Sequence, residues 1–267
     1  MLGKLMKYEW KATWKLLLSA NLLTVVMTGL ARWMVYLMDK APYSSDFQMV
    51  DFVAVMVLFT YVASMFAVYV GTAIYLIHRF YTSTYGDQGY LLHTLPVDTH
   101  HIIIAKTLVS AIWVGISVAL IYVSVILLFV SSEDAFLNMM EGMVDVIEFV
   151  SGDKITVFTL VMTLIAAVFS LFARVLKIGA CISLGQLSSN HKLLCSFGWY
   201  VGIYLVEAVI QGIYFFIRLI FEDYSSHVDY LPYFSTQWET TLLAGIISCV
   251  VFYILTWYVM SRKLNLD

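Results

Sequence analysis

The sequence predicts an all-α integral membrane protein with six transmembrane helices. Apolar residues make up 61% of the 267 residues and charged residues only 12%, whereas a soluble domain is about half apolar and about a quarter charged. Six apolar runs also reach the length of about 20 residues that a helix needs to cross a bilayer. Their apolarity is continuous and not alternating, which excludes a membrane β-barrel.

The expected spans follow one another along the whole chain. They cover residues 16–38, 52–77, 107–130, 155–173, 197–220 and 241–260. Lys and Arg indicate their orientation, because loops that carry these residues stay in the cytoplasm. Eleven of the fifteen lie on one side of the spans: Lys4, Lys7, Lys11, Lys15, Arg79, Lys106, Arg174, Lys177, Lys192, Arg262 and Lys263. We call this the basic side, and we expect both termini on it, facing the cytoplasm.

Residues 1–15 are expected to form an amphipathic elbow helix. Its four lysines recur at spacings of three and four, which places them on one stripe of a helix. Such a helix would lie in the inner headgroup layer of the membrane before the chain turns into the first span. A plain basic anchor for the first span explains the same lysines equally well.

Two segments on the opposite side are acidic. Residues 131–153 are expected to form an amphipathic helix on the outer surface, since Ser131 and Asp134 have the spacing of a capping box. The outer loop 221–240 combines acidic residues with Tyr and Trp, which is typical of a membrane interface. This surface would attract a cationic substrate such as a basic peptide, although the exclusion of Lys and Arg alone leaves the same pattern.

The fifth expected span contains a carboxylate, Glu207, near its middle. An ionised side chain at that depth is costly and usually faces protein or water. Gln211 lies one turn further on the same face and Arg218 three turns further; Arg32 in the first span and Lys177 are the other candidate partners. Two hypotheses follow, a substrate path or proton-coupling group, or a protonated Glu207 that is hydrogen-bonded between helices.

Catalytic and metal-binding motifs are not found in the sequence. His78, His93, His100 and His101 lie in or beside one loop, but the adjacent pair would point apart, so a solvated loop is expected and not a metal site. The chain contains no GxxxxGK[ST] phosphate loop for ATP. We therefore expect a non-catalytic chain with no cofactor and no nucleic-acid partner, driven by an ion gradient or by another polypeptide.

The longest loop on the basic side, residues 78–106, has a structured sequence. TYGDQG predicts a turn, GYLLHTL predicts a short helix that Pro96 ends, and a further helix begins before Lys106. A short helix that bears aromatic and leucine side chains is suited to the groove of a partner protein.

This loop resembles the cytoplasmic loop of ABC-2-type transporter permeases. The resemblance rests on Asp87, Gly89, Leu92, Leu95, Pro96 and, ten residues further on, Lys106. Asp87 stands where many such permeases carry glutamate. The start MLGKLMKYEWKAT, the end SRKLNLD and the segment IGACISLGQLSSNHKLLCS in the inner loop 174–196 are similar to those of a bacterial, largely Firmicutes, subgroup of these permeases.

The resemblance implies that residues 84–97 form a coupling helix, seated in a cleft of a separate ATPase subunit that binds ATP and Mg. Two such ATPases and a second permease chain, identical or different, would complete an exporter in the bacterial cell membrane. Its substrate would be a peptide, an antibiotic or a lipid-like amphiphile. The residues implied in coupling are Tyr85, Asp87, Gly89, Tyr90, Leu91, Leu92, Leu95, Pro96 and Lys106.

Two alternatives belong to other classes of protein. The first is a stand-alone, gradient-driven six-span transporter with Glu207 as its titrating group. Such carriers often contain inverted repeats and broken helices, neither of which is visible in the sequence. The second is a membrane immunity or sensor protein that binds an antimicrobial peptide without transporting it.

Overall fold

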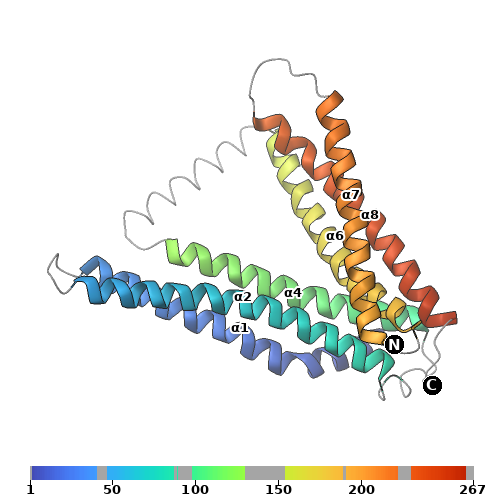
Figure 1. The fold of residues 1–267 in the computed structure, drawn as a ribbon, viewed down its shortest axis with the longest axis horizontal. Coiled ribbons are helices and arrows are strands. Elements are labelled where there is room, and N and C mark those ends of the chain that lie inside the picture. The colour runs from blue at the N-terminus through green and yellow to red at the C-terminus, as the bar shows by residue number, and fades with distance from the viewer. Residues whose placement is uncertain are drawn as a thin grey trace. The chain divides into compact units, whose positions relative to one another are not determined.

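The computed structural model describes residues 2–40, 47–86, 89, 98–129, 154–188, 191–221 and 230–262. Over these residues all regular structure is helical, which confirms the all-α fold. The helices are α1 (Leu2–Lys40), α2 (Phe47–Tyr85), α4 (Thr99–Phe129), α6 (Lys154–Gly185), α7 (Lys192–Phe221) and α8 (Tyr230–Arg262) (Figure 1). Each of these six is long and apolar enough to cross a membrane. The chain is therefore a multi-pass membrane protein.

The helices are longer than the apolar runs that predicted them. α1 and α2 each contain 39 residues, or about 58 Å at about 1.5 Å per residue, against a hydrocarbon core about 30 Å thick. Hydropathy marks only the part of a helix that lies in lipid, since a helix continues equally well in water. The expected loop 78–106 is accordingly helical up to Tyr85 and again from Thr99.

The other loops differ from expectation in the same way. The inner loop expected over 174–196 is helical up to Gly185 and again from Lys192. The outer loop expected over 221–240 is helical from Tyr230 onward. The amphipathic segment expected over 131–153 lies outside the described residues.

The elbow helix is not confirmed as a separate element, because α1 continues through Lys15 without a break. Its first turns pack on protein: the rings of Trp10 and of Trp113 on α4 are stacked with their centroids 4.9 Å apart. The lysine stripe nevertheless lies on the exposed face of α1. An amphipathic pattern requires one apolar contact surface, and another helix satisfies that requirement as well as lipid does.

The chain divides into two compact units. The N-terminal unit contains Gly3–Arg79 and Leu108–Val157, and the C-terminal unit contains Phe80–Thr107 and Phe158–Asp267 together with the first two residues. The N-terminal unit is thus built from α1, most of α2 and most of α4. The C-terminal unit contains α6, α7 and α8 with the end of α2 and the start of α4. α2 and α4 therefore each contribute to both units.

Each unit has its own buried apolar cluster. In the N-terminal unit it consists of Leu17, Leu76, Val109 and Trp113, which we call the apolar plug. In the C-terminal unit it consists of Ile102, Ile103, Leu176, Ala180, Phe252 and Met260. α7 is packed least, since only 6% of its apolar window is buried in the protein, against 17% to 28% for the other helices. Most of the surface of α7 is therefore left for lipid or for another chain.

Gly185 and Ser196 mark a close approach between the end of α6 and the start of α7. A Cβ atom at Gly185 would lie 2.7 Å from the carbonyl oxygen of Lys192 and 1.8 Å from the Oγ of Ser196. At Gly198, further along α7, a Cβ atom would meet nothing within 4 Å. Only the first of these glycines is required by the packing within the chain.

We expect Gly185→Ala to destabilise the protein by about 1 to 3 kcal/mol, because the backbone of α7 would have to shift. Gly198→Ala is the matched control and should leave stability unchanged or raise it by up to about 1 kcal/mol through helix propensity. Thermal unfolding of both variants in the same detergent measures the difference. Equal melting temperatures would contradict the close approach.

Candidate functional site

The turn that follows α2 is tight and depends on glycine. The N–H of Gly89 donates a hydrogen bond to the carbonyl oxygen of Gly86 at 2.7 Å. A Cβ atom at Gly89 would lie 2.3 Å from the carbonyl oxygen of Thr84, and one at Gly86 would lie 2.7 Å from that of Thr82. Real Cβ atoms do not approach backbone this closely, so any side chain at Gly89 would displace the turn.

The end of α2 is fixed to α6. The hydroxyl of Tyr85 donates a hydrogen bond to the Oγ of Ser183 at 2.6 Å, and Ser183 is fully buried. One turn away, Gly179 leaves room for the ring of Phe80, which would lie 3.3 Å from a Cβ atom at that position. A hydrogen bond and a ring contact therefore hold the first flank of the loop.

The start of α4 is fixed by Lys106, whose side chain is buried. Its ammonium donates a hydrogen bond to the Oγ of Ser83 and lies 5.9 Å from the centroid of the Phe80 ring. Burying a charged amine is tolerated only where such partners compensate its lost hydration. Lys106 therefore anchors the second flank of the loop to the end of α2 and does not extend from its surface.

The first turn of α4 also contacts α8. The Nδ1 atom of His100 and the hydroxyl of Tyr253 are 2.6 Å apart, and the rings of His100 and Trp257 are stacked at 5.2 Å. His101 faces a different partner, with its Nδ1 atom 3.7 Å from a carboxylate oxygen of Asp98. Within the described part of the chain, no three His, Cys, Asp or Glu side chains gather as metal ligands.

The predicted coupling residues are thus described only in part. Tyr85, Gly89 and Lys106 lie in the flanks of the loop as given above. The other six lie outside the described residues: Asp87, Tyr90, Leu91, Leu92, Leu95 and Pro96. The structure therefore shows how the loop is held at both ends.

Glu207 forms an ion pair between α7 and α6. Its Oε2 atom is 2.6 Å from the Nζ of Lys177, and the two side chains are 30% and 12% exposed. The same ammonium lies 5.8 Å from the ring centroid of Tyr200, one face of which it covers. Because Lys177 compensates the carboxylate, the pair can lie among apolar residues without an isolated charge.

The other candidate partners of Glu207 are Gln211, Arg218 and Arg32. The side chain of Gln211 is exposed on α7, and that of Arg218 lies outside the described residues. Arg32 belongs to the N-terminal unit, where its guanidinium donates a hydrogen bond to the carbonyl oxygen of Leu127 at 2.6 Å. Within the described part of the C-terminal unit, Lys177 is thus the candidate that contacts the carboxylate.

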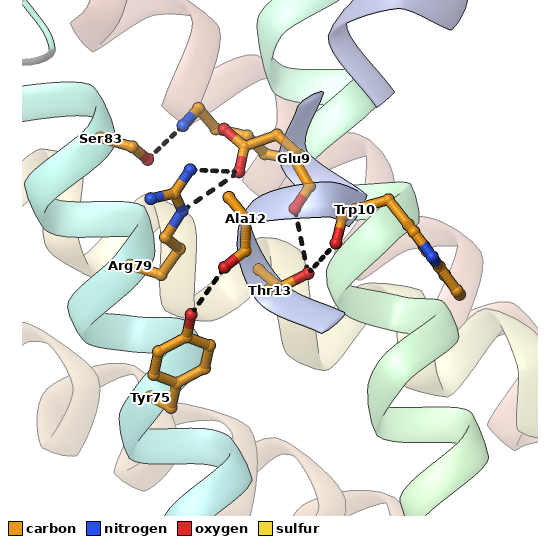
Figure 2. A network of polar contacts seen from close by, with 8 residues as sticks. Glu9, Trp10, Ala12, Thr13, Tyr75, Arg79 and Ser83 are labelled. Carbon is orange, nitrogen blue, oxygen red and sulfur yellow. Dashed lines mark hydrogen bonds and ion pairs between the residues drawn. The ribbon is translucent and has the colours of Figure 1, made fainter. Parts of the chain in front are cut away.

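A second ion pair was not predicted from the sequence. Figure 2 shows Arg79 at the end of α2 directed toward Glu9 of α1, with its Nε and Nη2 atoms both 3.3 Å from Oε2 of Glu9. The hydroxyl of Tyr75 donates a hydrogen bond to the carbonyl oxygen of Ala12 at 3.3 Å (Figure 2). These contacts hold the first turns of α1 on α2. The sequence feature that could have indicated this pair is Glu9 itself, the one acidic residue among the four lysines of residues 1–15.

Comparisons with known proteins do not identify a family or a function for this chain. The chain matches no family model, no curated protein and no solved structure. The resemblance of the loop to ABC-2 permeases therefore rests on the residues of this chain and remains a hypothesis.

The Lys177–Glu207 pair predicts a measurable coupling energy between α6 and α7. We expect Lys177→Met and Glu207→Met each to lower the free energy of unfolding, and the double variant to lose less than the sum. The expected difference is about 1 to 2 kcal/mol, the range of polar contacts between membrane helices. The free energies of unfolding of the unaltered protein, the two single variants and the double variant are measured in mixed detergent micelles.

Gln211→Met, on the same helix, is the matched control for this cycle and should change stability little, since its side chain is exposed. Strictly additive effects of the two substitutions would show that the pair does not couple the helices.

Proposed function

We propose that this chain is the non-catalytic, membrane-spanning subunit of an ATP-driven exporter of the ABC-2 type. A separate ATPase subunit, present in two copies, would bind ATP and Mg and supply the energy. A second permease chain, identical or different, would complete the pathway across the bacterial cell membrane. The cargo would be a peptide, an antibiotic or a lipid-like amphiphile.

The observation that supports this proposal is the double attachment of the loop between α2 and α4. Tyr85 ties its first flank to α6, and His100 ties its second flank to α8. Lys106 joins the two flanks to each other through Ser83. A loop held in this way is suited to transmit a displacement, whereas a loop without such contacts would absorb it.

Coupling also has an energetic requirement. ATP binding in a partner can favour one conformation of the permease only if the contacts at the loop differ between conformations. Residues 90–96, with their leucines and aromatic side chain, supply apolar contact surface to a groove. The tight turn at Gly86 and Gly89 fixes where that surface begins.

A gradient-driven transporter is the second candidate, and the Lys177–Glu207 pair favours it. A carboxylate and an amine in contact at 2.6 Å can exchange a proton or open to water as the helices move. Such a carrier has no need of an anchored loop, and this is why we rank it second.

Co-purification tests the two candidates directly. The tagged chain is extracted from native membranes in mild detergent, the accompanying proteins are identified, and ATP hydrolysis is assayed. A stoichiometric ATPase supports the permease. A chain that purifies alone and without ATPase activity overturns it and leaves the gradient-driven carrier.

Tyr90→Asp combined with Leu92→Asp should abolish association with the ATPase, because two carboxylates would be forced into an apolar groove. Leu187→Asp is the matched control: Leu187 is exposed in the other turn on the basic side and lies outside the loop. Association is measured by recovery of the ATPase from membranes. Intact association in the double variant would exclude the loop as the docking element.

Gly89→Ala should weaken ATPase association and the coupled ATPase activity, since the added methyl group displaces the turn by its contact with Thr84. Gly71→Ala on α2 is the control, because a Cβ atom there meets nothing within 4 Å. The ATPase activity of each purified variant is measured relative to that of the unaltered protein. Equal relative activities in the two variants would show that the turn geometry does not matter for coupling.

A further inference from the structure

The second half of α7 carries its polar residues on a single face. Between residues 200 and 218 they recur at spacings of four, three, four, three and four, which is the repeat of one helix face. Every other residue of this stretch is apolar or glycine. We call the series the polar face of α7: Tyr200, Tyr204, Glu207, Gln211, Tyr214 and, by its position along the helix, Arg218.

This face is long and largely uncovered. From Tyr200 to Tyr214 it extends for about 21 Å at about 1.5 Å per residue, against a hydrocarbon core about 30 Å thick. Within the described part of the chain Tyr204 is 58% and Tyr214 46% exposed, and Gln211 is exposed as well. The edge of the face toward α6 is in contact, because Glu207 pairs there with Lys177.

Lipid is a poor environment for the polar face. Gln211 lies near the middle of the expected span 197–220, and hydrocarbon offers its amide no hydrogen-bond partner. The hydroxyl of Tyr204, two turns earlier, has the same requirement. Polar side chains at this depth usually face protein or a water-filled space. The exposed side chains of this face therefore require a polar neighbour that is not lipid.

A tightly packed helix of another chain does not suit this face. Helices in a membrane approach closely at small residues, and the polar face contains none. The glycines of this helix lie elsewhere: Gly198 and Gly202 are each two residues from Tyr200, which is about half a turn of helix. A Cβ atom at either glycine would meet nothing within 4 Å. Another helix would therefore pack on the glycine side and leave the polar face open.

We propose that the polar face of α7 lines a water-filled pathway along which the cargo crosses the membrane. This inference rests on the proposed transport function, whichever source supplies the energy. Because Lys177 compensates Glu207, the described side chains of the face offer hydrogen bonds and aromatic surface without a net charge. Tyrosine combines an apolar ring with a polar hydroxyl. The face is thus suited to an amphiphilic cargo, such as a peptide, that needs both kinds of contact.

Substituted-cysteine labelling tests this inference position by position. The three native cysteines are replaced by alanine, and one cysteine is introduced into the full chain, which is kept in native membranes with its partners. Gln211→Cys and Tyr204→Cys lie on the polar face. Val209→Cys and Val206→Cys are the matched controls, since each lies two residues from its counterpart, at nearly the same depth and about half a turn away.

A charged methanethiosulfonate reacts with thiolates, which form in water and not in lipid. We expect Gln211→Cys and Tyr204→Cys to react at least about tenfold faster than the two controls. Exposure alone cannot produce this difference, because Tyr204 is 58% exposed and both valines are 59% exposed. Mass spectrometry of the purified chain after timed labelling gives the rates.

The two positions on the polar face also protect the test against a variant that does not fold, since either one with its own control is sufficient. If the cysteine-free chain does not fold, the introduced cysteines are placed in the unaltered chain and the labelling of the native cysteines is subtracted.

Equal rates at the polar and control positions would overturn the proposal, because the two sides of α7 would then share one environment. Slow labelling of Gln211→Cys, with a disulfide between two copies under mild oxidation, would overturn it as well. A second chain would in that case cover the polar face.

The labelling does not depend on an ATPase, so its failure and that of the proposed exporter are distinguishable. Fast labelling of the polar face in a chain that purifies alone supports the pathway and removes the exporter. Slow labelling in a chain that co-purifies with an ATPase leaves the exporter in place and overturns the assignment of the pathway to α7.

Discussion

Lipid offers no hydrogen-bond partner, and most of this structure follows from that constraint. Inside a bilayer each polar group has to be satisfied by the chain itself. The backbone meets the requirement by forming helices from end to end. Some side chains meet it by turning toward neighbouring helices: Glu207 toward Lys177, Arg32 toward a backbone carbonyl, and Ser124 toward two other hydroxyls. Others, such as Thr60 and Thr163, donate to a carbonyl oxygen of their own helix. Polar residues of the first kind identify which helices touch.

The apolar residues obey the opposite rule. Between helices in lipid there is no hydrophobic driving force, because lipid tails are as apolar as leucine. Large apolar side chains in the spans accordingly face outward, and α7 is the clearest case. The buried cluster of the C-terminal unit instead gathers residues from the helix ends on the expected basic side, including Ile103 of α4, Leu176 of α6 and Met260 of α8.

Hydropathy was sufficient to predict the six helices, because the requirement for about 20 apolar residues is a property of the membrane and is read from composition alone. It could not predict where the helices end, because a helix can extend beyond the bilayer into water. The helices that begin at Thr99 and end at Gly185 both run past the apolar segments that predicted them. Lys177 was one of four candidate partners for Glu207, but spacing along one helix cannot choose a partner on another. The contact of Glu9 with Arg79 spans 70 residues and has no local pattern at all. The resemblance to a permease loop predicted nine coupling residues, and the structure describes only the three of them that lie in the flanks of the loop.

The continuity of α2 and α4 gives the anchored loop its significance. Both helices belong to the N-terminal unit over most of their length and to the C-terminal unit near the loop. A displacement of the loop would reach α6 and α8 through Tyr85 and His100, and it would reach the N-terminal unit through the helical backbone itself. α2 and α4 each continue from one unit into the other without a break. The two described flanks of the loop are therefore attached to the C-terminal unit by side-chain contacts and are continuous with the N-terminal unit along α2 and α4.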